Sequence, residues 1–187
     1  MRLDKPRIAP LAESELDDKS RAMLGERFRS GKILNIFRTL IKAPKAYKAF
    51  MWWGGYILSD HNDLPARERE IIILRTGFNW KSGYEWVQHV RIGKDCGLTD
   101  EEIERIKAGP DAPGWTPIES AMLQATDELT GDGHVADATW AALADLTEKQ
   151  RMDLVMTVGQ YSQVSMLLNS FGVQLDDDLV LDPDLTA

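Results

Sequence analysis

Three short patterns constrain the fold of this chain more than any other feature. Each has a threonine followed three residues later by a glutamate or glutamine, an arrangement in which the two residues cap each other's backbone N–H at a helix start. The pairs are Thr99 with Glu102, Thr116 with Glu119 and Thr147 with Gln150. The last pair precedes a long apolar segment, so the second half of the chain is predicted to be helical.

Helix signals also dominate the first half. Pro44 and Pro65 are predicted to occupy the first position of two helices, where the missing N–H of proline costs nothing, and Ser14 is predicted to cap an earlier helix. The one strand-like run, Ile71–Leu74, follows charged residues without a turn signal, and strict alternation is absent. We therefore expect a single all-α domain over residues 1–187, with about eight helices joined by short loops.

Composition restricts the classes of partner. The 187 residues include 30 acidic and 22 basic side chains, for a net charge of −8, whereas nucleic acids and anionic membranes bind positive surfaces. No apolar run is long enough for a membrane span, and the first residues lack the apolar segment of a secretory signal. Cys96 is the only cysteine, which excludes an intrachain disulfide and a cysteine-rich metal site. These features favour a cytoplasmic protein with no nucleic-acid or membrane partner.

Glu85 and His89 are the residues that most directly indicate chemistry. Four positions apart on a helix, they lie on one face and can touch. A carboxylate beside an imidazole favours the imidazolium and fixes its orientation, which suits a general acid or base near neutral pH. The same spacing is common on solvated helix faces, so the pair alone leaves both interpretations open. Glu70 is either a third member of this site or a solvated residue of a charged stretch.

The order of motifs around this pair resembles the carboxymuconolactone decarboxylase family, which includes the alkyl hydroperoxide reductase D-type peroxidases. The motifs are E-x-x-I-L-R from Glu70, YEW-x-x-H from Tyr84 and G-L-T-x-E-E-I from Gly97. The resemblance is strongest over residues 64–107 and extends over about residues 35–172. It implies an all-helical fold that assembles into homo-oligomers, with the site near a subunit boundary. A trimer or hexamer is the expected assembly, and a dimer is the alternative.

At two positions the chain departs from the peroxidase branch of that family. Ser82 and Glu85 stand where that branch has the cysteines of a C-x-x-C motif. Thiol peroxidation needs one thiolate to attack the peroxide and a second thiol to resolve the sulfenic acid. The resemblance therefore implies a lyase of the decarboxylase type, without cofactor or metal. A peroxidase that uses Cys96 between subunits and a non-catalytic oligomeric binding protein remain the alternatives.

The resemblance and the chemistry of the side chains together give a role to each site residue. His89 is the expected proton donor, Glu85 its orienting partner and Glu70 a second carboxylate in the same network. The expected substrate is a small cyclic or aromatic-derived carboxylic acid. For Ser82 the alternative to substrate binding is helix capping, and for Tyr84 and Trp86 it is packing. The residues expected to bind the substrate are Ser82, Tyr84, Trp86 and Arg38, with Arg75 and Arg91 as alternative partners of its carboxylate.

Overall fold

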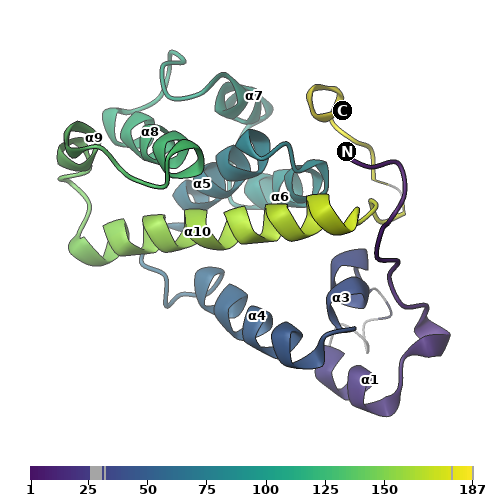
Figure 1. Ribbon diagram of the computed structural model, residues 1–187. Helices are drawn as coiled ribbons and strands as arrows, with labels where there is room; N and C mark the ends of the chain where they lie inside the picture. Colours follow the sequence, from purple (N-terminus) through teal and green to yellow (C-terminus); the bar gives the residue numbers. More distant parts are fainter. Residues whose placement is uncertain (26–30, 32, 178, 187) are drawn as a thin grey trace.

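The computed structural model of the protein describes residues 1–25, 31, 33–177 and 179–186 (Figure 1). Within them the backbone forms nine α-helices, two short 3₁₀ helices and no strand, which confirms the predicted all-α class. The 3₁₀ helices are η1 (Glu13–Glu15) and η2 (Pro183–Leu185). The α-helices are α1 (Asp18–Leu24), α3 (Asn35–Leu40), α4 (Pro44–Ile57), α5 (Ala66–Asn79), α6 (Gly83–Asp95), α7 (Asp100–Ala108), α8 (Pro117–Gly131), α9 (Asp137–Ala142) and α10 (Glu148–Phe171).

The three predicted capping boxes start α7, α8 and α10. At α7 the Thr99 N–H donates to a Glu102 carboxylate oxygen at 2.9 Å, and the Glu102 N–H donates to Thr99 Oγ1 at 3.2 Å. The same reciprocal pair of bonds is made at the other two helices. Because the first N–H groups of a helix have no partner within the helix, these bonds fix where each one begins.

Two predicted starts in the first half of the chain are wrong by a few residues. Pro44 is the first residue of α4, as predicted, but Pro65 lies just before α5 in extended conformation. Ser14 lies inside η1 and does not cap α1. That helix is capped by Asp17, whose carboxylate accepts a hydrogen bond from the N–H of Ser20 at 2.7 Å. Aspartate is as good a cap as serine, so residue type alone did not separate the two.

Helix α5 lies at the centre of the fold, packed against α6, α7, α8 and α10. Its four apolar residues, 71–74, are all fully buried. Ile71 and Leu74 face a core shared with α6 and α7, Ile72 faces one shared with α8 and α10, and Ile73 faces one shared with α4, α6 and α10. Because neighbours cover this part of α5 on several sides, residues 71–74 are all apolar, which is why the run resembles a buried strand in the sequence.

The longest helix, α10, runs across the molecule with α4 on one side and α5, α6 and α8 on the other (Figure 1). It contacts all four. Side chains of α4, α6 and α10 enclose a cavity between them, and this cavity holds the candidate site. In the part of the chain that the structure describes, no helix is both long enough and apolar enough to cross a membrane.

The two ends of the chain come together beside the C-terminal end of α10 (Figure 1). The Arg7 N–H donates to the carbonyl of Phe171 at 2.8 Å and so ties the N-terminal segment to that helix end. The C-terminal segment is held by Asp182, which pairs with Lys107 at 2.8 Å and accepts a bond from the Trp86 indole N–H at 3.0 Å. The terminal segments therefore cover the end of the α5–α6 hairpin.

Candidate active site

The α5–α6 hairpin brings the predicted acid–base residues together. The turn between the helices is tight, with Lys81 in left-handed conformation at a φ of +50°. A Cβ on Gly93 would lie 2.9 Å from the Leu98 side chain, so this glycine lets Leu98 pack against α6, and it would lie 3.8 Å from the Cβ of Glu70, in ordinary contact with α5. Glu70 on α5 then faces His89, which lies one turn before Gly93 on α6.

His89 lies between two carboxylates. Its Nδ1 is 2.7 Å from Glu70 Oε2, and its Nε2 is 3.0 Å from Glu85 Oε1. All three side chains are buried: Glu70 is 1% exposed, Glu85 is 4% exposed and His89 is 6% exposed. The sequence left open whether Glu70 and the Glu85–His89 pair were solvated, and the structure places them in one buried cluster.

Burial and the two carboxylates act on the imidazole in opposite directions. Burial lowers the pKa of His89, but the charges of Glu85 and Glu70 and their hydrogen bonds outweigh it and raise the pKa to about 10. The ring is therefore protonated at neutral pH and donates one N–H to each carboxylate. In this state neither ring nitrogen has a lone pair for a metal ion.

Glu85 and His89 line a cavity of about 280 Å³ between α4, α6 and α10. The Tyr161 ring also lines it and meets the His89 ring edge-on, with 4.9 Å between centroids. Glu70 lies behind His89 and does not line the cavity. The site is thus a buried chain of acid–base groups with one end open to an apolar space. Apolar lining residues include Ile36, Phe37, Phe50, Met51 and Val164.

The predicted substrate-binding residues do not all reach this cavity. Tyr84 lines it, and its hydroxyl donates to an Asp176 carboxylate oxygen at 2.6 Å. Ser82 is fully buried at the start of α6, Trp86 packs in the core against α7, and Arg38 lies on α3; none of these three lines the cavity. Adjacent residues of a helix point about 100° apart, so Trp86 points away from the cavity that its neighbour Glu85 lines.

The arginines considered as partners for a substrate carboxylate lie elsewhere. Arg38 donates to the side chain of Asn35, and Arg75 donates to both carboxylate oxygens of Asp127 at 2.6 and 2.7 Å. Arg91 is exposed and lines a different surface hollow. Among the described residues, no lysine or arginine lines the cavity beside Glu85. Apart from His89, whose ring nitrogens face Glu70 and Glu85, the described residues therefore supply no cation there for a carboxylate.

Two lining residues on α10 were not predicted from the sequence. Gln160 is 4% exposed, and its amide oxygen has no hydrogen-bond partner in the described structure. Tyr161 follows it and packs on His89. The available signal was positional: Gln160 falls in the same helical stripe as Val164 and Leu168, which are both buried, so a polar side chain stands where an apolar one is expected.

Cys96 does not line the cavity. It ends α6 and is only partly exposed. Burial and the charge of Glu70 raise the pKa of its thiol, which lowers the fraction of reactive thiolate. A catalytic cysteine is expected to have a lowered pKa and access to its substrate, and Cys96 has neither feature.

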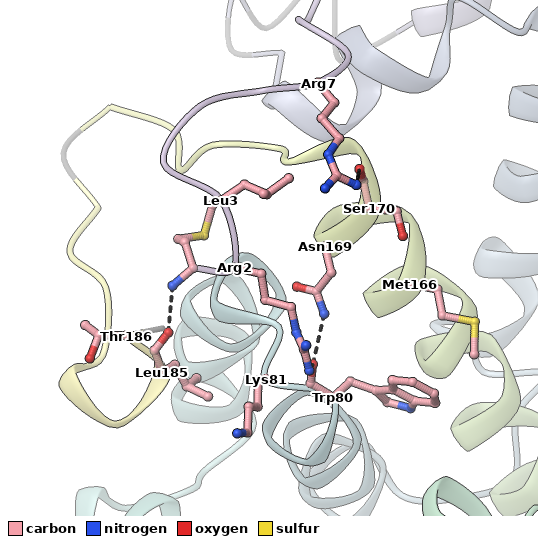
Figure 2. Close-up of a pocket in the computed structure, with 11 residues that line it drawn as sticks. Arg2, Leu3, Arg7, Trp80, Lys81, Met166, Asn169, Ser170, Leu185 and Thr186 are labelled. Atoms are coloured by element: carbon pink, nitrogen blue, oxygen red, sulfur yellow. Dashed lines mark hydrogen bonds between the residues drawn. The ribbon is translucent and has the colours of Figure 1, made fainter.

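A second cavity, of about 580 Å³, lies where the terminal segments meet α5 and α10 (Figure 2). Three exposed cations line it: Arg2, Arg7 and Lys81. Arg2 donates to the carbonyl of Trp80 at 3.3 Å, and Arg7 donates to the carbonyl of Ser170 at 3.4 Å. Those carbonyls belong to the C-terminal ends of α5 and α10, which carry partial negative charge. Both arginines therefore have a structural role as helix-end partners.

Residues 44–128 match the model of the carboxymuconolactone decarboxylase family. The matched range includes both carboxylates and the histidine of the cluster. Over these residues the chain is similar to the carboxymuconolactone decarboxylase family. Together with the all-helical fold, the match confirms the resemblance noted in the sequence. Among curated proteins, none matches the chain.

Solved structures share the fold of this chain. The alkylhydroperoxidase AhpD core protein of Ralstonia eutropha JMP134 has a TM-score of 0.77 at 22% identity, covering 93% of this chain and 95% of that one. A peroxidase-related protein of Silicibacter sp. TM1040 has a TM-score of 0.78 at 13% identity, covering 94% and 96%. The debrominase Bmp8, in complex with 2,3,4-tribromopyrrole, has a TM-score of 0.76 at 14% identity, covering 93% and 94%. At these identities the likeness shows the fold alone.

Proposed function

We propose that the protein is a cofactor-free acid–base enzyme, a lyase or isomerase, that acts on a small and mostly apolar cyclic molecule. One observation carries the proposal. His89 has both ring nitrogens on buried carboxylates, and the assembly opens onto an apolar cavity through Glu85. Strongly perturbed titratable groups in a cavity are typical of catalytic sites.

In this proposal Glu85 is the group that exchanges a proton with the substrate. It lines the cavity, whereas the N–H groups of His89 are occupied by carboxylates. Glu85 accepts a proton from a substrate carbon, the electron pair moves into the substrate, and Glu85 returns the proton at the product atom. The imidazolium stays charged throughout, because Glu70 holds its other N–H. This reverses the sequence-based expectation, in which His89 was the donor and Glu85 the orienting partner.

The properties of Cys96 favour this chemistry over a thiol peroxidase. A peroxidase cycle needs a thiolate that reaches the peroxide and a second thiol. The only cysteine of the chain has a raised pKa and does not line the cavity. The buried charges also favour an enzyme over a binding protein, because a binding cavity of this kind needs no imidazolium held by two carboxylates.

The size of the cavity supports a substrate of about one ring. An apolar cavity of roughly 150 Å³ is enough for benzene in another protein, and this one is about 280 Å³. The structurally similar debrominase Bmp8 binds 2,3,4-tribromopyrrole, which is also a single small ring. Decarboxylation, the reaction in the family name, needs a carboxylate substrate, so it is the alternative to this proton exchange.

We also propose that the protein is a homo-oligomer in which a neighbouring subunit covers the mouth of the cavity. Leu58 and Ile92 line the cavity and are 46% and 38% exposed, and Trp52 nearby on α4 is 76% exposed. Exposed apolar side chains in one region favour an interface. Light scattering should give the mass of a trimer or hexamer, and a dimer is the alternative assembly. A monomer at micromolar concentration would contradict the proposal.

Proton exchange provides the test that needs no knowledge of the natural substrate. A panel of small cyclic ketones is incubated in D₂O with enzyme, and deuterium entry next to the carbonyl is followed by NMR. The wild type should accelerate exchange for at least one ketone. Glu85→Gln should slow it by about 10²–10⁴-fold, since positioned acid–base catalysis contributes that much, and Cys96→Ser should retain the wild-type rate.

Two outcomes would contradict the proposal. If Cys96→Ser loses activity while Glu85→Gln keeps it, thiol chemistry operates. If no ketone exchanges faster with enzyme than without it, the non-catalytic binding protein is favoured. Thermal unfolding of each variant shows whether a lost rate reflects lost fold.

A further inference from the structure

Tyr161 is a buried residue whose hydroxyl has no partner among the described residues. Its side chain is 5% exposed and lines the cavity beside Glu85 and His89. No described residue forms a hydrogen bond with this hydroxyl, yet its oxygen retains accessible surface, unlike the amide oxygen of Gln160, which is inaccessible. Buried hydroxyls are almost always paired, so this one requires an explanation. An unpaired O–H at the wall of an apolar cavity is a donor for a bound molecule.

The hydroxyl of Tyr161 lies close to the carboxylates that hold His89. Burial and the charges of Glu85 and Glu70 raise the pKa of Tyr161, so its hydroxyl stays protonated at neutral pH. The Tyr161 ring meets the His89 ring edge-on. The cavity wall therefore combines a proton acceptor, Glu85 on α6, with a neutral hydrogen-bond donor, Tyr161 on α10.

Most other polar groups of the wall already have partners. The hydroxyl of Tyr84 and the side-chain N–H of Gln88 both donate to Asp176, at 2.6 and 2.9 Å. The ring nitrogens of His89 face carboxylates, and no described lysine or arginine lines the cavity. The amide nitrogen of Gln160 is a second unpaired donor among the described residues. A substrate carboxylate would lack a free cation here, whereas a carbonyl oxygen needs only one neutral donor.

We propose that Tyr161 is a catalytic residue, that its hydroxyl donates a hydrogen bond to the carbonyl oxygen of the substrate, and that the substrate is an uncharged ring ketone. This rests on the proposed function, in which Glu85 accepts a proton from a substrate carbon. That carbon is the one next to the carbonyl group. The substrate class therefore differs from the carboxylic acid expected from the sequence.

The hydrogen bond from Tyr161 acts where charge develops. As Glu85 takes the proton, the electron pair of the broken C–H bond forms a C=C bond, and the π electrons of the carbonyl move onto its oxygen. The enolate oxygen is held by the Tyr161 O–H, which keeps its own proton. The electrons then return, and Glu85 gives the proton back to carbon. A fixed donor aimed at a developing oxyanion lowers the barrier to this step.

The carbonyl signal of a bound ketone tests this hydrogen bond without requiring turnover. Cyclohexanone labelled with ¹³C at the carbonyl is titrated with the enzyme, and its ¹³C shift is extrapolated to the bound state. Because a hydrogen bond moves this signal downfield, cyclohexanone bound to the wild type should lie near or beyond its position in water. In Tyr161→Phe, which removes only the hydroxyl, the bound signal should move upfield, toward its position in cyclohexane.

Deuterium exchange of the same ketone measures the effect on catalysis. Tyr161→Phe should lower kcat by about 10²-fold, as the loss of one such donor does, with a smaller change in KM. Tyr56→Phe is the matched control, since the Tyr56 hydroxyl donates to Asp153 at 2.6 Å and Tyr56 does not line the cavity; it should keep the wild-type rate and bound signal. Thermal unfolding should show no loss of stability in Tyr161→Phe, because its hydroxyl has no partner to lose.

The proposal is overturned if the bound signal is the same in the wild type and Tyr161→Phe, if only Gln160→Leu moves it, or if cyclohexanone does not bind at millimolar concentration. Should Tyr161→Phe fail to fold, the wild-type signal decides alone, and a position near that in cyclohexane contradicts the hydrogen bond. A signal that depends on Tyr161 without exchange on any ketone would contradict the proposed function and support ketone recognition. Exchange that Tyr161→Phe neither slows nor shifts would do the reverse.

Discussion

Two cavities of this protein place their charges in opposite ways. The cavity at the chain ends is the larger, about 580 Å³ against about 280 Å³, and its cations Arg2, Arg7 and Lys81 are exposed (Figure 2). The cavity between α4, α6 and α10 has an apolar wall, and its charges, on Glu85 and His89, are buried and paired. In the first cavity water screens the charges, and in the second the protein alone compensates them.

This difference, rather than cavity size, is the basis on which we propose the functional region. Exposed arginines at helix ends stabilise the fold slightly and need no further explanation. A buried ion cluster is costly to desolvate, and well-packed apolar residues often stabilise a protein as much or more. Its presence beside an apolar cavity therefore indicates a role in chemistry.

The largest expected effect breaks the buried cluster. His89→Ala leaves the carboxylates of Glu70 and Glu85 buried without their cation, which should lower the free energy of unfolding by about 3–5 kcal/mol. Lys81→Ala, at the other cavity, removes an exposed charge and should change it by less than about 0.5 kcal/mol. Urea unfolding followed by circular dichroism measures both. Equal changes in the unfolding free energy of the two variants would contradict the described difference between buried, paired charges in one cavity and exposed charges in the other.

Replacing the whole cluster sharpens the same comparison. The triple variant Glu70→Leu, Glu85→Leu and His89→Leu removes all three charges together, so no unpaired group is left. We expect it to recover most of the stability lost in His89→Ala, by roughly 2–4 kcal/mol, while proton exchange is abolished. If the triple variant were less stable than the single one, the cluster would be needed for the fold, and its retention would not indicate chemistry.

The stability that the cluster contributes should depend on pH in one direction. The pKa of His89 in the folded protein, about 10, is above the value of about 6.5 for an unfolded chain. Protonation therefore favours the folded state, fully below about pH 6.5, and this contribution is lost as the pH rises toward 10. The difference in unfolding free energy between the wild type and the triple variant, measured from pH 6 to 10, should shift against the wild type. A constant difference would contradict the raised pKa.

The smallest expected effect concerns the helix ends at the other cavity. Arg7→Gln removes a cation beside the C-terminal carbonyls of α10 and should cost about 0.3–1 kcal/mol at low salt, less at high salt. Thermal unfolding at two salt concentrations measures this. A loss of proton exchange in Arg7→Gln would show that this cavity takes part in function after all.

The fold was predictable because its signals are local. Capping boxes such as Thr99 with Glu102 act within one turn, and the structure contains each predicted box. One error arose where two nearby residues could each cap the same helix, as Ser14 and Asp17 could before α1. The burial of all of residues 71–74 depends on neighbours far along the chain, so the apolar run alone did not distinguish a buried helix from a buried strand.

The site was predictable only where its residues share a helix or a motif. Glu85 and His89 lie one turn apart, and the family motif supplied Glu70. Gln160 comes from α10 and reaches the cavity only through packing against α6, which no local pattern encodes. The choice among arginines failed for the same reason: the sequence does not reveal that Arg75 is already paired with Asp127.

The protonation state of His89 tests the central claim most directly. The chain has three histidines, and His61 and His134 are exposed and supply comparison signals for the imidazole ¹⁵N resonances. With His89 held between Glu70 and Glu85, both of its ring nitrogens should remain protonated from pH 5 to about 9. A His89 ring that loses its proton near pH 6.5 would show that the two carboxylates do not hold a permanent imidazolium, and the proposed acid–base site would be wrong.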